Sequence, residues 1–180
     1  VRLLVVVLWF GVDDGMVLDG CFAKWKAEGR TVETIATILS PAQPYEIHLR
    51  PAIMLSAHEV AQRIASGAKV FDARAAERFR GEVEALDKRA GHIEGAGNIP
   101  LAQLYEGDPP RLKSADKLRA LFAEHGLVDG KSATAYCGSG VTACQLLWAM
   151  DQAGLKDLYL YPGSWSEWIE LYPEAGHVLT

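Results

Sequence analysis

The sequence predicts an α/β domain in which helices cover both faces of a central, mostly parallel sheet. Two observations carry this prediction. Short strand-forming runs lie at residues 69–72 and 132–136, and amphipathic helical patterns lie between and after them. When strands and helices alternate along a chain, the crossing helices leave the strands parallel and cover the sheet. Ligands of such sheets bind beyond the carboxyl ends of the strands, so Asp72 and Cys137 are expected to meet at one edge.

The N-terminal stretch, residues 1–39, begins with an apolar octet from Leu3 to Phe10. This octet is far too short to span a bilayer, and no small-residue cleavage pattern follows it. We therefore expect a buried helix, although three consecutive valines are poor helix formers. Residues 40–56 are expected to form a linker, because a Ser-Pro-Ala-Gln-Pro run breaks helical structure and an extended segment follows at 45–49.

The main domain is expected from residue 57 onwards. Ser56 occupies an N-cap position, and Glu59 three residues later completes a capping box for a helix over 57–66. After the strand at 69–72, the segment from 74 to 91 is long, polar and irregular. Gly97-Asn98 then supplies the residue types of a turn.

The last elements surround a tight turn of sequence Cys-Gly-Ser-Gly-Val-Thr, residues 137–142. Ser114 is the expected cap of a helix that ends near His125, because apolar residues at 118, 121 and 122 share one face. The strand at 132–136 follows, and an apolar helical pattern runs from Val141 to Gln152.

This strand-to-helix turn makes Cys137 a candidate nucleophile. Its two glycines allow close backbone approach, and N–H groups at a helix N-terminus favour a thiolate and cradle an anion. The alternative is a small buried hydrophobe, the commonest fate of a free cysteine. Phosphate-ester cleavage, arsenate reduction and sulfur transfer all use such a loop. Phosphate chemistry is disfavoured, because the loop contains no arginine to clamp a phosphate.

Composition limits the remaining classes of function. The 180 residues are 49% apolar and 23% charged, which suits one complete domain and part of another in a cytoplasmic enzyme. The net charge of −5 provides no general attraction to nucleic acid or to anionic membranes. Three scattered cysteines, at 21, 137 and 144, do not form a disulfide framework, and no spacing typical of a metal site occurs.

The loop resembles that of the rhodanese family, and Cys-Gly-Ser-Gly-Val-Thr resembles its 3-mercaptopyruvate sulfurtransferase branch. Further segments match in order: Val-Phe-Asp-Ala-Arg at 70–74, Arg-Phe-Arg-Gly at 78–81, Gly-His-Ile-Glu-Gly-Ala at 91–96 and Tyr-Pro-Gly-Ser-Trp-Ser-Glu-Trp at 161–168. The third departs from the family's Gly-His-Ile-Pro-Gly-Ala at Glu94. The resemblance covers residues 57–180 and implies a catalytic rhodanese domain there.

An internal repeat points to a second copy. A shift of 143 positions places Gly11 on Gly154 and Trp25 on Trp168, so that 10–28 repeats 153–171 as helix, strand and helix. Tandem members of the family have an inactive first domain. The resemblance therefore implies that residues 1–39 are the C-terminal remnant of such a domain, with an earlier part missing from the chain.

The resemblance also implies a mechanism without metal or organic cofactor. Cys137 takes a sulfur from 3-mercaptopyruvate, or from thiosulfate, and passes it to cyanide, to a small thiol or to a thioredoxin-like protein. The loop residues bind the donor and stabilise the persulfide through their N–H groups; they are Gly138, Ser139, Gly140, Val141 and Thr142. Because Gly138 and Ser139 carry no positive charge, mercaptopyruvate is the expected donor.

Other site residues come from the same resemblance. Arg78, six residues after Asp72, is expected to bind the donor carboxylate, with Arg89 as a second contact. Asp72 is expected to orient its neighbours, and Ser139 to assist proton transfer. Cys144 and His92 are expected to be structural, and the tryptophans at 25, 165 and 168 to be core or interdomain aromatics. The alternatives are a thiosulfate sulfurtransferase and a non-catalytic rhodanese-like binding module.

Overall fold

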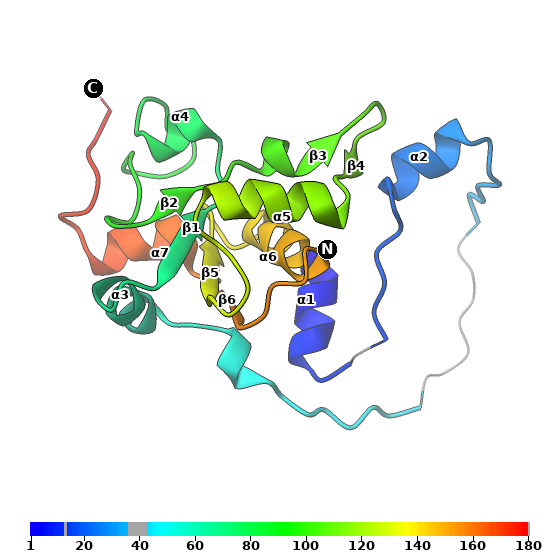
Figure 1. Ribbon diagram of the computed structural model, residues 1–180, viewed down its shortest axis with the longest axis horizontal. Helices are drawn as coiled ribbons and strands as arrows, with labels where there is room; N and C mark the ends of the chain where they lie inside the picture. Colours follow the sequence, from blue (N-terminus) through cyan, green and yellow to red (C-terminus); the bar gives the residue numbers. More distant parts are fainter. Residues whose placement is uncertain (13, 36–42, 180) are drawn as a thin grey trace.

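The computed structural model describes residues 1–12, 14–35 and 43–179 and contains a four-stranded parallel sheet (Figure 1). The strand order is β2-β1-β5-β6, formed by β1 (Lys69–Asp72), β2 (Gly97–Asn98), β5 (Ala133–Tyr136) and β6 (Leu158–Leu160). Every neighbouring pair in this sheet is parallel. The predicted α/β class is therefore confirmed.

Helices cover both faces of the sheet, as expected. Helices α3 (Ala57–Ala65) and α7 (Ser164–Leu171) belong to one buried cluster, and α5 (Ala115–Glu124) and α6 (Ala143–Gln152) belong to the other. Side chains of β1 and β5 alternate between the clusters, because successive residues of a strand point to opposite faces. Val70 and Tyr136 pack with α3 and α7, whereas Phe71 and Ala135 pack with α5 and α6.

Local signals set the helix starts. The Ser56 hydroxyl accepts from the backbone N–H of Glu59, and the Glu59 carboxylate accepts from the N–H of Ser56 at 2.8 Å, which is the predicted capping box. The Ser114 side chain likewise accepts from the N–H of Lys117 at the start of α5. Helix α6 begins at Ala143, two residues after the predicted start.

The segment between β1 and α5 differs from the prediction in two places. Gly97-Asn98 forms strand β2 beside β1, not a turn. The reason is tertiary: the Asn98 amide donates to the carbonyls of Asp72 and Arg74, which pulls the segment against β1. The irregular stretch contains one short helix, α4 (Ala76–Phe79). It is followed downstream by η2 (Leu101–Leu104) and a small hairpin of β3 (Tyr105–Glu106) and β4 (Arg111–Leu112).

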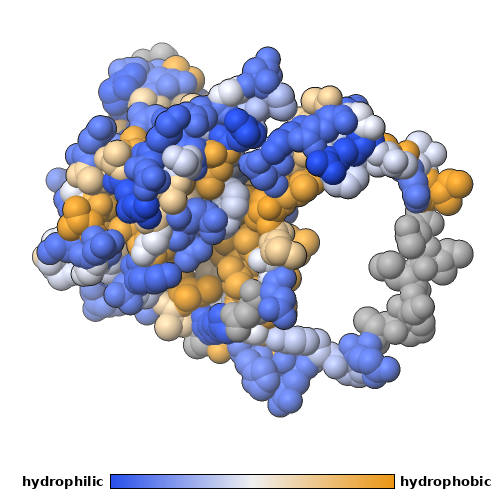
Figure 2. Space-filling model, turned by 45° about the vertical axis from the view of Figure 1, so that its right-hand side comes forward, coloured by the Kyte–Doolittle hydropathy of each residue, from blue (hydrophilic) through white to orange (hydrophobic). Residues whose placement is uncertain are grey.

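The N-terminal segment, here the described residues of 1–53, lies beside the body formed by the sheet and its covering helices, and part of the segment loops away from that body (Figures 1 and 2). Helix α1 (Arg2–Trp9) packs on α6. The predicted helix is confirmed, but the expected burial is wrong, because only Val5 of α1 is buried. Figure 2 shows hydrophobic residues gathered on the part of the body that faces this segment. No described helix is both long and apolar enough to cross a membrane.

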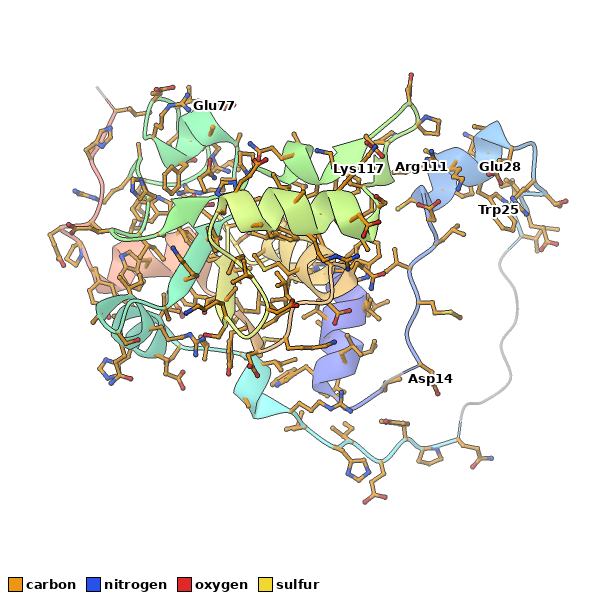
Figure 3. All side chains as sticks on the ribbon, in the orientation of Figure 1. Asp14, Trp25, Glu28, Glu77, Arg111 and Lys117 are labelled. Atoms are coloured by element: carbon orange, nitrogen blue, oxygen red, sulfur yellow. The ribbon has the colours of Figure 1, made fainter. Side chains whose placement is uncertain are left out.

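Helix α2 (Cys21–Ala27) and η1 (Pro51–Ile53) complete the segment. Trp25 lies on α2 away from the sheet (Figure 3), where its indole N–H donates to the Thr31 carbonyl, so of the two expected positions it does not occupy the core one. The expected strand within the repeat is also absent from the described residues 14–19, because no neighbouring strand is available to pair with it. Residues 45–49 are exposed and without regular structure, and linker positions 40–42 lie outside the described residues.

Candidate active site

The loop at 137–142 connects the central strand β5 to α6 at the carboxyl edge of the sheet. Cys137 is held from both sides by α7: its N–H donates to the Ser164 hydroxyl at 3.1 Å, and its carbonyl accepts from the N–H of Trp165 at 2.9 Å. The residue is only 2% exposed. The start of α7 therefore sets the position of the candidate nucleophile.

Gly140 closes the loop against the segment before α7. Its φ is +77°, a conformation that side chains rarely adopt, and a Cβ there would lie 2.6 Å from the Pro162 carbonyl oxygen. The Gly140 carbonyl accepts the thiol hydrogen of Cys144 at 3.2 Å. Within the described part of the chain, no backbone N–H of residues 138–142 donates a hydrogen bond. These donors therefore remain available to a bound anion.

We expect Gly140→Ala to lower the free energy of unfolding more than Gly130→Ala does. Both glycines have a φ of +77°, but a Cβ at Gly130 meets nothing within 4 Å. The difference between the two variants therefore isolates the clash with Pro162, which is expected to cost about 1–3 kcal/mol. Urea unfolding of both variants measures it. Equal destabilisation would show that the loop yields to the extra methyl group.

A cavity of about 510 Å³ opens beside the loop. Of the predicted site residues, it brings together Cys137, Gly138, Ser139, Val141, Thr142 and Arg78. Gly140 belongs to the loop but does not line the cavity, and neither do Asp72 and Arg89. The remaining wall contains charged, polar and apolar residues, namely Ala73, Arg74, Ala75, Leu86, Asp87, Leu101 and Ser166.

Arg78 reaches the cavity from α4, with its guanidinium held by two carboxylates. It donates to Glu84 through Nε at 3.1 Å and Nη2 at 2.6 Å, and Nη2 also contacts Asp87 at 3.2 Å. The adjacent Glu77 is exposed at the outer surface of α4 (Figure 3). Burial favours a higher pKa for Glu84, but hydrogen bonds from Arg78 and the backbone outweigh it and lower that pKa. Glu84 therefore stays ionised and fixes the guanidinium.

Asp72 does not line the cavity but fixes a residue that does. Its side chain is fully buried and accepts from the Arg74 guanidinium at 2.7 Å and from the Arg74 N–H at 2.8 Å. Burial disfavours the charged guanidinium, yet the hydrogen bonds to Asp72 raise the pKa of Arg74. Arg74 also donates to the Gly91 carbonyl and lies over the Trp165 ring. Asp72 thus acts on this site through Arg74.

A comparison with known protein families identifies the family to which this loop and cavity belong. Residues 56–171 match the family described as the rhodanese-like domain. The chain belongs to the rhodanese family. This confirms the resemblance seen in the sequence, over nearly the range expected from it.

Some relatives of this rhodanese chain are named 3-mercaptopyruvate sulfurtransferases, and others are named thiosulfate sulfurtransferases. It is 38% identical to a probable 3-mercaptopyruvate sulfurtransferase of Pseudomonas aeruginosa, over 89% of this chain and 57% of that protein. It is 36% identical to the putative thiosulfate sulfurtransferase SseB of Mycobacterium tuberculosis, over 88% of this chain and 55% of that protein. The crystal structure of the 3-mercaptopyruvate sulfurtransferase SseA from Escherichia coli superposes with a TM-score of 0.78 at 33% identity, covering 92% of this chain and 62% of that one. The chain therefore spans little more than half the length of these curated relatives.

Three other residues considered in the sequence, Arg89, His92 and Cys144, make contacts within the protein and do not line the cavity. Arg89 donates to the carbonyls of Ala175 and Gly176, so its guanidinium binds the C-terminal segment. His92 stacks on Phe79 and hydrogen-bonds the Phe79 carbonyl at 2.7 Å. Cys144 is buried, as predicted, while Cys21 is exposed.

The polar residues that surround the rhodanese loop from other segments could not be identified from the sequence. Ser166 donates to Asp87 at 2.5 Å and lies 2.8 Å from the Gly138 carbonyl, which links α7, the irregular segment and the loop. Ser166 was visible only as part of the closing motif at 161–168. Asp87 and Glu84 carried no signal, because the irregular segment around them has no periodicity from which to orient a side chain.

Proposed function

We propose that this chain is the sulfur-transferring part of an enzyme that carries sulfur on Cys137. The observation that supports this most is the position of Cys137 in a glycine loop whose N–H groups have no protein acceptor among the described residues. The loop lies beside a cavity that contains an arginine, Arg78. Such a loop stabilises a negatively charged sulfur by oriented dipoles.

The reaction has two steps. The Cys137 thiolate attacks the sulfur of 3-mercaptopyruvate, the carbon–sulfur bond breaks, and the resulting enolate takes up a proton to become pyruvate. An acceptor thiolate then attacks the outer sulfur of the persulfide, the sulfur–sulfur bond breaks, and the Cys137 thiolate is restored. Covalent catalysis of this kind divides one difficult transfer into two easier ones.

Each residue around the cavity has a role in this scheme. Arg78 binds the donor carboxylate, because a guanidinium fork matches a planar anion. The N–H groups of Gly138, Ser139, Gly140, Val141 and Thr142 stabilise the persulfide, and the exposed Ser139 hydroxyl assists proton transfer. Asp72 acts as a positioning residue that holds Arg74.

We propose 3-mercaptopyruvate rather than thiosulfate as the preferred donor. The loop supplies no side-chain cation after Cys137 to attract a doubly charged anion. Thiosulfate remains the second candidate, because relatives of similar identity carry that name. A non-catalytic binding module is less well supported, since the cysteine and its loop are both present.

Mass spectrometry of the chain after incubation with each donor tests this function. We expect the Cys137 peptide to gain one sulfur, about 32 Da, with 3-mercaptopyruvate and less completely with thiosulfate. Cyanide added afterwards is expected to remove the extra mass. Labelling of Cys21 or Cys144 in place of Cys137 would contradict the proposal, and so would the absence of any gain with either donor.

We also propose that residues 10–28 repeat 153–171, with 1–39 as the end of a first rhodanese-like copy, 40–56 as a linker and 57–180 as the catalytic domain. Backbone geometry supports the repeat: Gly11 and Gly154 both have a φ of +88°, and Cys21 and Ser164, also 143 positions apart, have φ values of +53° and +55°. For the acceptor we propose a small thiol or a thioredoxin-like protein, in the cytoplasm.

A further inference from the structure

Asp87 places a carboxylate in the wall of the Cys137 cavity. One of its oxygens accepts from the Ser166 hydroxyl at 2.5 Å, and the other lies 3.2 Å from Nη2 of Arg78. The side chain is 9% exposed, so the carboxylate is largely removed from water. Its charge is therefore screened less than that of a surface residue.

The ion-pair cluster that holds Arg74 and Arg78 contains more carboxylates than guanidinium groups. Arg74 is paired with Asp72, and Arg78 makes its two shorter hydrogen bonds with Glu84. With Asp87 included, three carboxylates share two guanidinium groups in this cluster. At neutral pH the cluster thus carries one excess negative charge before the Cys137 thiolate is counted.

Of the three carboxylates, Asp87 is the one that lines the cavity, next to the loop on which a donor must bind. A Cβ placed on Gly138 would be 3.8 Å from Oδ2 of Asp87 and also 3.8 Å from both terminal nitrogens of Arg78. A donor that contacts the loop at Gly138 therefore comes close to the cation and to the extra carboxylate together. Its interaction with Asp87 grows with each negative charge that it carries.

We propose that Asp87 determines which sulfur donors this site accepts, by disfavouring donors with two negative charges relative to donors with one. The inference rests on the proposed sulfur-transfer function and adds a specificity residue to it. Asp87 acts in two ways. It repels the donor in proportion to the donor's charge, and it occupies part of the Arg78 fork. The first effect disfavours thiosulfate, a dianion, relative to 3-mercaptopyruvate, a monoanion.

The first test compares the two donors in Asp87→Asn. Asparagine keeps an oxygen for Ser166 but removes the charge, so the ratio of kcat/KM for thiosulfate to kcat/KM for 3-mercaptopyruvate is expected to rise about tenfold. The freed Arg78 fork favours the planar carboxylate of 3-mercaptopyruvate, so this second effect opposes the expected rise and cannot produce it. Glu82→Gln is the matched control: Glu82 also lies in the irregular segment, but it is exposed and paired with Arg80 outside the cavity. In Glu82→Gln the ratio of the two kcat/KM values is expected to equal that of the wild type.

The second test needs no turnover. Alkylation of Cys137 by negatively charged iodoacetate and by neutral iodoacetamide is followed by mass spectrometry, and the ratio of the two rates reports the local charge. Any change in thiolate content affects both reagents equally. We expect the iodoacetate-to-iodoacetamide ratio to increase in Asp87→Asn and not in Glu82→Gln, with a smaller difference at high salt.

These outcomes separate the two hypotheses. If the wild type transfers no sulfur but Asp87→Asn raises the alkylation ratio, the proposed function fails while the charge effect of Asp87 stands. If the wild type turns over and both ratios are the same in Asp87→Asn as in the wild type, Asp87 does not select donors, and the inference is overturned.

Discussion

Cys137→Ser is expected to abolish sulfur loading, with a fall in turnover of more than about a thousandfold, because a serine hydroxyl is not an effective nucleophile without a dedicated base. Within the hydrogen bonds of the described residues, no histidine contacts the loop to act as such a base. The substitution is nearly isosteric, and the backbone bonds of Cys137 to Ser164 and Trp165 do not depend on sulfur. The variant is therefore expected to fold normally.

The two other cysteines provide matched controls. Cys144 is buried, and burial, with a smaller contribution from the charge of Cys137, raises the pKa of its thiol to about 11. It is therefore protonated at neutral pH, and a serine there can still donate to the Gly140 carbonyl. Cys21 is exposed on α2. We expect Cys144→Ser and Cys21→Ser to load sulfur at Cys137 as the wild type does.

Mass spectrometry and turnover together decide this prediction. Sulfur loading on the Cys137 peptide is measured in each variant, and circular dichroism checks that each one is folded. Full turnover by a folded Cys137→Ser protein would rule out the persulfide mechanism. Loss of loading in Cys144→Ser would mean instead that the hydrogen bond to Gly140 sets the loop geometry more strongly than we expect.

Arg78→Ala is expected to lower kcat/KM for 3-mercaptopyruvate by about ten- to a hundredfold, the usual loss for one charge-assisted hydrogen-bonded contact. The donor carboxylate is present only until the persulfide forms, so the loading step is expected to slow and the acceptor step is not. Arg74 also contacts Glu84, at 3.4 Å, so the substitution does not leave that buried carboxylate without a cation. Arg78→Lys is expected to recover part of the loss, because lysine keeps the charge but lacks the fork.

Arg80 supplies the control for this prediction. It follows Arg78 closely in the sequence but is exposed and paired with Glu82. Arg80→Ala is therefore expected to leave both half-reactions unchanged. Stopped-flow measurement of persulfide formation and decay separates the steps. A normal loading rate in Arg78→Ala would remove Arg78 from the donor site.

Local sequence determined the elements whose signals are local. The capping box at Ser56 and Glu59 places the start of α3, because both hydrogen bonds lie within one helical turn. The loop at 137–142 was recognisable for a similar reason. Its residue types, the strand before it and the helix after it all follow from one continuous stretch of sequence. The alternation of strands and helices was enough to predict a parallel sheet.

Tertiary structure decided which polar residues surround the candidate nucleophile. Arg78 and Arg89 lie in the same polar segment, yet one lines the cavity and the other holds the C-terminal segment. Asp87 reaches the cavity because Arg78 and Ser166, which are far apart in the sequence, both hydrogen-bond to it. No local period orients such a segment. Its side chains take their directions from partners that only the folded chain brings within reach.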